Sequence, residues 1–133
     1  MRDVPFTRSL LGRLWRRHET MRADWDRRAR ENAAFYVCTT AADSPASFAA
    51  SGERDLEEKV LDGLAVSPGW KVLEIGCGMG RLVKPLSRRV ARVVGVDLSD
   101  ETLRRAREYC AALPNVELLR TEGWLDFLPS NSF

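Results

Sequence analysis

The stretch VLEIGCGMGRL, residues 72–82, constrains the fold more than any other part of this chain. A short run that is apolar apart from Glu74 leads directly into glycines at three alternate positions, Gly76, Gly78 and Gly80. A glycine-rich turn between a strand and a helix lets the backbone approach a ligand closely, while N–H groups at the helix start face that ligand. The stretch therefore predicts a strand, a ligand-binding turn and a helix.

The pattern after this turn alternates between strands and helices. Strands are predicted at residues 71–75, 90–96 and 116–120, and helices at 79–89 and from Ser99 to about Ala112. Pro85 must lie early in the first helix or bend it, and Ser99 is typical of an N-cap. Strands that alternate with helices form parallel β-α-β units with right-handed crossovers, so an α/β fold is expected. Apolar runs such as 90–96 are typical of strands buried on both faces.

The N-terminal third shows a different pattern. Residues 8–34 predict one long helix with a single apolar stripe, which we interpret as packing surface. The stripe consists of Leu11, Leu14, Trp15, His18, Met21, Trp25 and Ala29. Residues 38–53 are small and polar and predict a loop, and helical periodicity returns over 53–64. The expected organisation is a helical segment at 1–37, a loop at 38–54 and a ligand-binding domain at 55–133.

Charge and cysteine content narrow the class of protein. The chain has 133 residues and a net charge of +2, so it suits one modest domain and implies no particular partner. Residues 1–30 hold nine arginines and no lysine. They could meet an anionic partner such as RNA or lipid headgroups, but interleaved acidic residues favour a solvated helix face. The three cysteines are widely spaced, which argues against a disulfide framework or a zinc site and fits a reducing cytoplasm.

Other functional classes find little support in the sequence. His18 is the single histidine, so a histidine-based metal site or catalytic triad is not expected, and no metal is predicted. No apolar run is long enough to span a membrane, and the N-terminus lacks a signal-peptide core. The chain is therefore expected in the cytoplasm, without a membrane partner.

Two carboxylates beyond the glycine turn indicate the kind of ligand. Asp97 ends the second predicted strand and Glu122 follows the third. The carboxyl ends of neighbouring parallel strands meet at one crevice, and an acid at the Asp97 position can accept hydrogen bonds from both ribose hydroxyls. A nucleoside ligand is therefore predicted.

The glycine spacing separates one nucleoside class from another. A dinucleotide fingerprint needs G-x-G-x-x-G, but Arg81 occupies the third glycine position, and no G-K-[ST] follows as in a phosphate-binding loop. Glu74 suits a ligand that carries a positive group better than a pyrophosphate. An NAD-linked oxidoreductase stays open as a weaker alternative.

The motif E-x-G-x-G-x-G followed by G-V-D-L-S resembles the class I S-adenosylmethionine-dependent methyltransferases. The resemblance covers roughly residues 55–133, and the stretch MRADWDRRARENAAFYV also resembles the leader of some bacterial members. It implies a Rossmann-like three-layer parallel sheet, here preceded by a long N-terminal helix. It also implies S-adenosylmethionine as cofactor and S-adenosylhomocysteine as product.

The resemblance assigns residues to the methionine and ribose ends of the cofactor. Glu74, Gly76 and Gly78 would line the methionine end, with Glu74 facing the ammonium group directly or through water. Gly80 would allow the tight turn, and Asp97 would bind the ribose hydroxyls.

The adenine end is assigned in the same way. Leu98 would pack on the adenine, Glu122 would accept from its amino group, and Gly123 would offer a backbone N–H to the ring. Trp124 would stack on the ligand or wall the pocket; a core residue covering the sheet is the equal alternative. Cys77 lies within the glycine turn and is interpreted as a small filler beside the cofactor, not a nucleophile.

The chain departs from the family at its end. It stops at LPSNSF, where the family continues into its fourth strand, so it would supply strands 1 to 3 of the order 3-2-1-4-5-7-6. The open edge of the first strand should pair with another chain, which would make a homo-oligomer, be covered by the N-terminal helix, or belong to a longer polypeptide. Catalytic residues stay unassigned, because the family's acceptor-binding residues lie largely after the fourth strand.

The sequence therefore predicts the cofactor-binding portion of a methyltransferase. A small-molecule acceptor is the first expectation, with the N-terminal helix and the 38–53 loop as a lid, and RNA is the second because of the arginine-rich helix. A non-catalytic module that binds the nucleoside or forms an oligomer is the alternative from another class.

Overall fold

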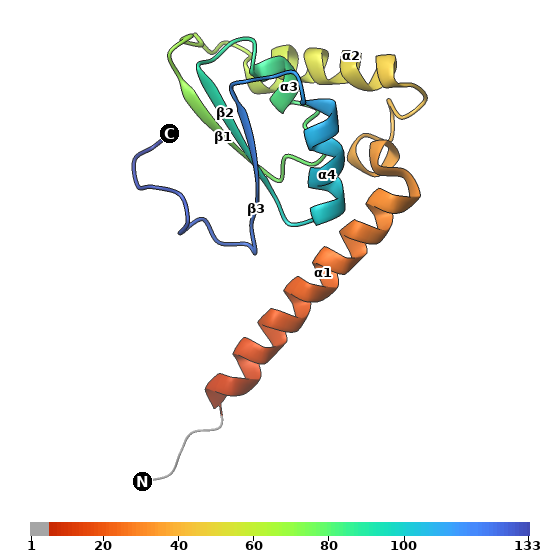
Figure 1. Ribbon diagram of the computed structural model, residues 1–133, viewed down its shortest axis with the longest axis vertical. Coiled ribbons are helices and arrows are strands. Elements are labelled where there is room, and N and C mark those ends of the chain that lie inside the picture. Colours follow the sequence, from red (N-terminus) through yellow and green to blue (C-terminus); the bar gives the residue numbers. More distant parts are fainter. Residues whose placement is uncertain (1–5) are drawn as a thin grey trace.

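The computed structural model describes the backbone of residues 6–133 and the side chains of residue 17 and of residues 19–133 (Figure 1). Predictions about Leu11, Leu14, Trp15, His18 and the first arginines concern side chains outside the described residues. The elements in chain order are α1 (Phe6–Val37), α2 (Pro45–Asp55), a π-helical turn η1 (Leu56–Val60), β1 (Lys71–Ile75), α3 (Val83–Leu86), β2 (Arg92–Asp97), α4 (Asp100–Tyr109) and β3 (Val116–Arg120).

The three strands form one parallel sheet in the order β1-β2-β3. Ile75 is in register with Val96, and Asp97 with Arg120, so the carboxyl ends of all three strands lie at one edge of the sheet. The predicted α/β class with parallel strands is confirmed. The bounds of β1 and β3 match the prediction, whereas β2 begins at Arg92 rather than Val90.

The core lies between the sheet and its helices. Leu56, Val83, Val93 and Leu103 are 0% exposed and pack together in it. Figure 1 shows α2, α3 and α4 on one side of the sheet, and the chain after β3 running along the other side. The central strand is buried on both faces, as predicted, because Val94 and Val96 on the second face are also fully covered.

The loop predicted at 38–53 is wrong over its second half, where α2 begins at Pro45. Ser44 caps this helix: its side chain accepts from the N–H of Ser47, and the Ser47 hydroxyl accepts from the N–H of Ser44. This reciprocal pair is a capping box with serine in the place of the usual Glu or Gln. The small residues of α2 are needed for packing, because Ser51 and Gly52 are buried.

The helix predicted at 79–89 is much shorter in the structure. Only Val83–Leu86 is α-helical, and turns replace the rest. Pro85 has no N–H, so it cannot donate to the Arg81 carbonyl four residues before it. That carbonyl faces α2 instead, where an added Cβ on Gly52 would lie 2.2 Å from its oxygen. Pro85 thus shortens α3 and lets α2 pack closely on the turn before it.

The helix α1 runs past the carboxyl end of the sheet and packs against α4 (Figure 1). Asn32 interrupts α1 with non-helical backbone angles, so its last turn changes direction. Within the described residues β1 has no strand on its outer side, and Ile75 at its end is 67% exposed. No helix in the described part of the chain is long and apolar enough to cross a membrane.

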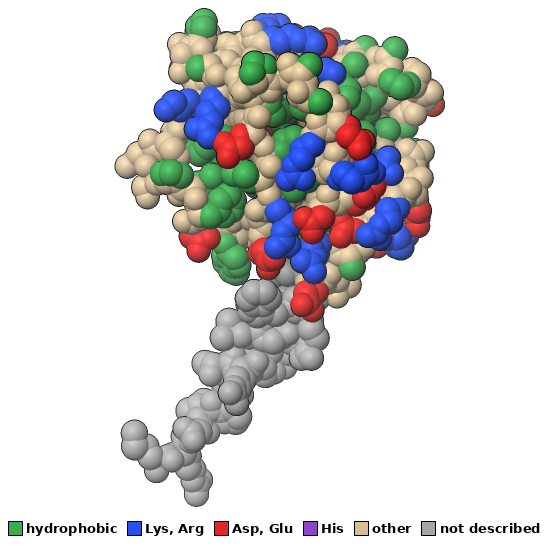
Figure 2. All heavy atoms as spheres, in the orientation of Figure 1, with side chains coloured by type: hydrophobic (Ala, Val, Ile, Leu, Met, Phe, Trp, Pro, Cys, Tyr) green, Lys and Arg blue, Asp and Glu red, His purple; other side chains and the backbone are tan. Residues whose placement is uncertain are grey.

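Charged side chains of both signs are interspersed on the face formed by α4 and the described part of α1 (Figure 2). On α1, Arg27 pairs with Asp24 and Glu31, and Arg28 pairs with Asp24. These pairs agree with a solvated helix face at Arg27 and Arg28. They leave those arginines less available to an anionic partner.

Gly52→Ala should destabilise the fold, although alanine is the better helix former. The added methyl would overlap the Arg81 carbonyl, and we expect a loss of about 2 kcal/mol or more in the free energy of unfolding. Urea unfolding followed by circular dichroism measures this loss. Gly69→Ala is the matched control, because the nearest atom to its new Cβ is a serine oxygen at 3.8 Å. Equal stability of the two variants would contradict the close approach of α2.

Candidate functional site

A cavity of about 510 Å³ opens at the carboxyl end of the sheet. This volume lies in the range of small-molecule and cofactor sites. The cavity is lined by Met21, Trp25, Tyr36, Val37, Glu74, Ile75, Gly76, Cys77, Gly78, Arg81, Leu82, Asp97, Leu98, Thr102, Thr121 and Gly123. Of the ten predicted site residues, the cavity brings together Glu74, Gly76, Cys77, Gly78, Asp97, Leu98 and Gly123.

The glycine turn is held against the end of β2. Gly76, Gly78 and Gly80 all have positive φ, of +73°, +55° and +80°, a conformation that favours glycine. The N–H groups of Gly76 and Cys77 both donate to the carbonyl of Val96, at 2.8 and 3.0 Å. Gly80 lies behind the cavity wall, where a Cβ would be 2.9 Å from the sulfur of Cys110. The tight turn at Gly80 stays a prediction, with which its positive φ agrees.

Asp97 is oriented by two backbone donors. Its Oδ2 accepts from the N–H of Gly78 and its Oδ1 from the N–H of Ser99, both at 2.9 Å. Each carboxylate oxygen has a second lone pair that can accept a further hydrogen bond. Asp97 is therefore fixed at the cavity wall and can still accept from two ligand hydroxyls.

Glu74 has the most unusual environment in the site. Its Oε2 is buried and has no hydrogen-bond partner among the described residues. Burial raises the pKa of Glu74 to about 7; nearby Arg81 acts to lower it and Asp97 to raise it. A buried carboxylate oxygen without a donor is costly unless a cation or donor meets it. The residue therefore fits the ammonium group of an amino-acid ligand.

Arg81 links the cavity to α2. Its Nη1 donates to Asp55 Oδ2 at 2.8 Å and to Ser51 Oγ at 3.4 Å, and the side chains of Arg81 and Asp55 are only 16% and 13% exposed. Sequence reasoning used Arg81 to exclude a third glycine but missed it as a lining residue. Its pairing depends on α2, which the sequence had not revealed.

The helix α1 supplies one wall of the cavity. Met21 and Trp25, predicted as packing surface, line the cavity and remain 52% and 37% exposed. Val37, at the end of the same helix, lies so close to the glycine turn that a Cβ on Gly78 would be 3.3 Å from it. An apolar stripe cannot by itself reveal whether it faces a core or a ligand, which is why these residues were missed.

The segment after β3 contributes Thr121 and Gly123 to the cavity. The Thr121 hydroxyl accepts from the Gly123 N–H and donates to the Trp124 carbonyl, which holds this segment in a tight turn. Glu122 pairs instead with Arg120 at 2.6 Å, and the Trp124 side chain is 61% exposed. Neither lines the cavity in this conformation, so their roles beside the adenine stay predictions.

Cysteine and metal chemistry add little to the site. The three cysteines are free thiols, and burial raises the pKa of Cys77, so that its thiol stays protonated at neutral pH. This state supports the interpretation of Cys77 as a filler, since the thiolate is the nucleophile. Within the described residues, no three His, Cys, Asp or Glu side chains are grouped so that they could hold a metal ion.

Comparison with known proteins identifies the domain. Residues 72–133 match the family model for a methyltransferase domain. A curated relative, the 23S rRNA (uracil(1939)-C(5))-methyltransferase RlmD of Alkalilimnicola ehrlichii, is 44% identical over 55 residues, which are 41% of this chain and 12% of the relative.

Two solved structures extend the similarity to the fold. A Haemonchus contortus phosphoethanolamine N-methyltransferase, in complex with phosphoethanolamine and S-adenosylhomocysteine, has 19% identity and a TM-score of 0.62. The aligned region covers 79% of this chain and 21% of the Haemonchus chain. The DhpI-SAM-HEP complex has 27% identity and a TM-score of 0.51. The aligned region covers 77% of this chain and 42% of the DhpI chain. The chain thus spans less than half the length of each of these proteins.

Residues 72–133 are therefore similar to the class I S-adenosylmethionine-dependent methyltransferases, as the matching domain model and the DhpI-SAM-HEP complex indicate. The cofactor of this class is S-adenosylmethionine. Glu74 and Asp97, the two predicted acidic residues of the glycine turn and the second strand, both line the cavity.

The raised pKa of Glu74 predicts a pH-dependent stability of the ligand-free protein. Its folded-state pKa of about 7 lies above the ordinary value of 4.5, so the folded protein keeps a proton that the unfolded chain releases between these values. The free energy of unfolding should fall by about 2–3 kcal/mol as the pH rises through this window. Glu74→Gln should remove most of this dependence in urea titrations at pH 5 and pH 8, whereas the exposed Glu58→Gln should keep it. An unchanged pH dependence in Glu74→Gln would contradict the buried, unpartnered carboxyl.

Proposed function

We propose that this chain binds S-adenosylmethionine in the cavity and presents its methyl group for transfer to a small-molecule acceptor. The observation that carries the proposal is the unpartnered Glu74 oxygen beside the fixed Asp97 carboxylate. Glu74 takes the ammonium group, Asp97 accepts from the ribose hydroxyls, and Leu98 packs on the adenine. The glycine turn between them leaves room for the backbone of the methionine end.

The residues of this chain bind and orient rather than exchange protons. When bound, S-adenosylmethionine supplies a sulfonium-activated methyl group, which goes to an O, N or C nucleophile as the carbon–sulfur bond breaks and S-adenosylhomocysteine leaves. Positioning accounts for most of the acceleration that such a transfer needs. Glu74 and Asp97 fix the methionine end and the ribose of the cofactor, and the α1 side chains exclude water from one side. No described residue is assigned as a catalytic base.

The side chains that α1 contributes to the cavity favour a small-molecule acceptor over RNA. Met21 and Trp25 make the α1 wall largely apolar, and Arg27 and Arg28 on α1 are paired with acidic neighbours. RNA is the competing acceptor, because RlmD is by its name an rRNA methyltransferase. Binding of an RNA oligonucleotide that falls steeply with salt would favour RNA. The free cysteines suit a reducing cytoplasm, where we place the protein.

Two other functions remain distinguishable from this one. A non-catalytic module would bind the nucleoside or form an oligomer through the edge of β1 without methyl transfer to any acceptor. An NAD-linked oxidoreductase is disfavoured by Arg81, which occupies the third glycine position and is paired with Asp55. Binding of NAD at the same site would revive it.

We expect saturable binding of S-adenosylhomocysteine by isothermal titration calorimetry. Asp97→Ala should weaken binding at least about 30-fold, because it removes an acceptor for two ligand hydroxyls and the group that orients the glycine turn. Asp62→Ala, which changes an exposed carboxylate in the turn after η1, is the control and should bind like the wild type. No binding by the wild-type chain, or unchanged affinity in Asp97→Ala, would contradict the proposed site.

A further inference from the structure

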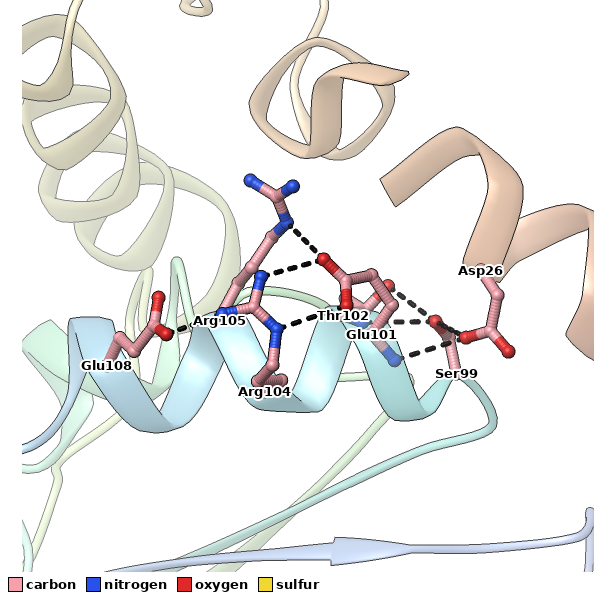
Figure 3. Close-up of polar contacts among 7 residues, drawn as sticks. All are labelled: Asp26, Ser99, Glu101, Thr102, Arg104, Arg105 and Glu108. Carbon is pink, nitrogen blue, oxygen red and sulfur yellow. Dashed lines mark hydrogen bonds and ion pairs between the residues drawn. The ribbon is translucent and has the colours of Figure 1, made fainter. Parts of the chain in front are cut away.

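The helix α1 meets the start of α4 through one carboxylate. Asp26 Oδ1 accepts from the hydroxyl of Ser99 at 2.5 Å and from the backbone N–H of Glu101 at 3.1 Å (Figure 3). These partners lie 73 and 75 positions away along the chain. The contact therefore joins the N-terminal helix to the domain that holds the glycine turn.

The donors are those that a helix start leaves without partners. Ser99 is the N-cap of α4, and its Oγ accepts from the N–H of Thr102. Asp26 accepts from the next free N–H, that of Glu101, and its negative charge lies at the positive end of the helix dipole. The Glu101 side chain pairs instead with Arg104 and Arg105, as Figure 3 shows. Among the residues drawn, Asp26 is therefore the carboxylate that accepts from the Ser99 hydroxyl and the Glu101 N–H at the start of α4.

The residues of this contact are next to two residues that line the cavity. Trp25, the neighbour of Asp26, lines the cavity on α1. The backbone N–H of Ser99 donates to Oδ1 of Asp97, whose other oxygen accepts from Gly78. A continuous set of hydrogen bonds thus runs from α1 through Ser99 and Asp97 to the glycine turn.

We propose that Asp26 is a positioning residue for the cofactor. It holds α1 against α4, so that Trp25 faces the cavity at a set place relative to Asp97. Asp26 itself does not line the cavity, and it acts by setting the place of Trp25 on α1. The inference rests on the proposed function, because the effect is read as affinity for the cofactor product.

The test measures S-adenosylhomocysteine affinity by calorimetry in matched variants. Asp26→Ala should weaken binding about five- to ten-fold, since charge-assisted hydrogen bonds to Ser99 and Glu101 are lost. Asp26→Asn keeps an oxygen that can accept from both donors and should bind within about two-fold of the wild type. Asp24→Ala is the matched control, because Asp24 pairs only with arginines on its own helix among the ion pairs of the described residues, and it should not change the affinity.

A double-mutant cycle separates positioning from general destabilisation. Trp25→Ala should weaken binding, and adding Asp26→Ala should weaken it little further, because the benefit of Asp26 passes through α1. If Asp26→Ala does not fold, as judged by circular dichroism, Asp26→Glu takes its place with the same expectation, since it displaces the carboxylate by one methylene. Wild-type affinity in Asp26→Ala, or in Asp26→Glu where it takes its place, or additive effects with Trp25→Ala, would overturn the inference. Absence of binding by the wild-type chain would instead refute the proposed function.

Discussion

The hydrogen bond from the Gly78 N–H to the Asp97 carboxylate joins the two segments on which the site depends. It locks the glycine turn after β1 to the end of β2, where the Val96 carbonyl already accepts from Gly76 and Cys77. A parallel sheet places these strand ends side by side, and the left-handed glycines let the turn bend between them. The cavity exists because this turn is held open rather than packed with side chains.

Burial of charge is the second feature of the site. Glu74 lines the cavity with an oxygen that no described residue satisfies, whereas the half-buried Arg81 is paired with Asp55 from α2. An unpaired carboxyl and a satisfied guanidinium therefore lie near each other. A cationic ligand group would relieve the cost of burying Glu74, and it would explain why the fold tolerates this acid.

Much of the ligand-binding unit could be predicted from local signals. Lys71–Ile75 and Val116–Arg120 were predicted to the residue, because apolar runs bounded by turns have few other interpretations, and Ser99 was predicted as an N-cap. The helix α2 was missed because Ser44 and Ser47 form a capping box without the usual Glu, over a run of small residues. The length of α3 was overestimated because Pro85 cannot donate to the Arg81 carbonyl, and because Arg88 and Arg89 donate three residues back, as in turns, rather than four.

The sequence by itself determined the βα-turn, the class of ligand and most of the residues around the turn that line the cavity. Glycine spacing, Glu74 and Asp97 follow from local backbone geometry and from the chemistry of the ligand. Only the tertiary structure decided that Met21, Trp25 and Val37 wall the cavity, that Arg81 is tied to Asp55, and that Asp26 reaches the start of α4. These contacts join residues tens of positions apart, and the period of an isolated helix carries no information about which distant element will cover its face.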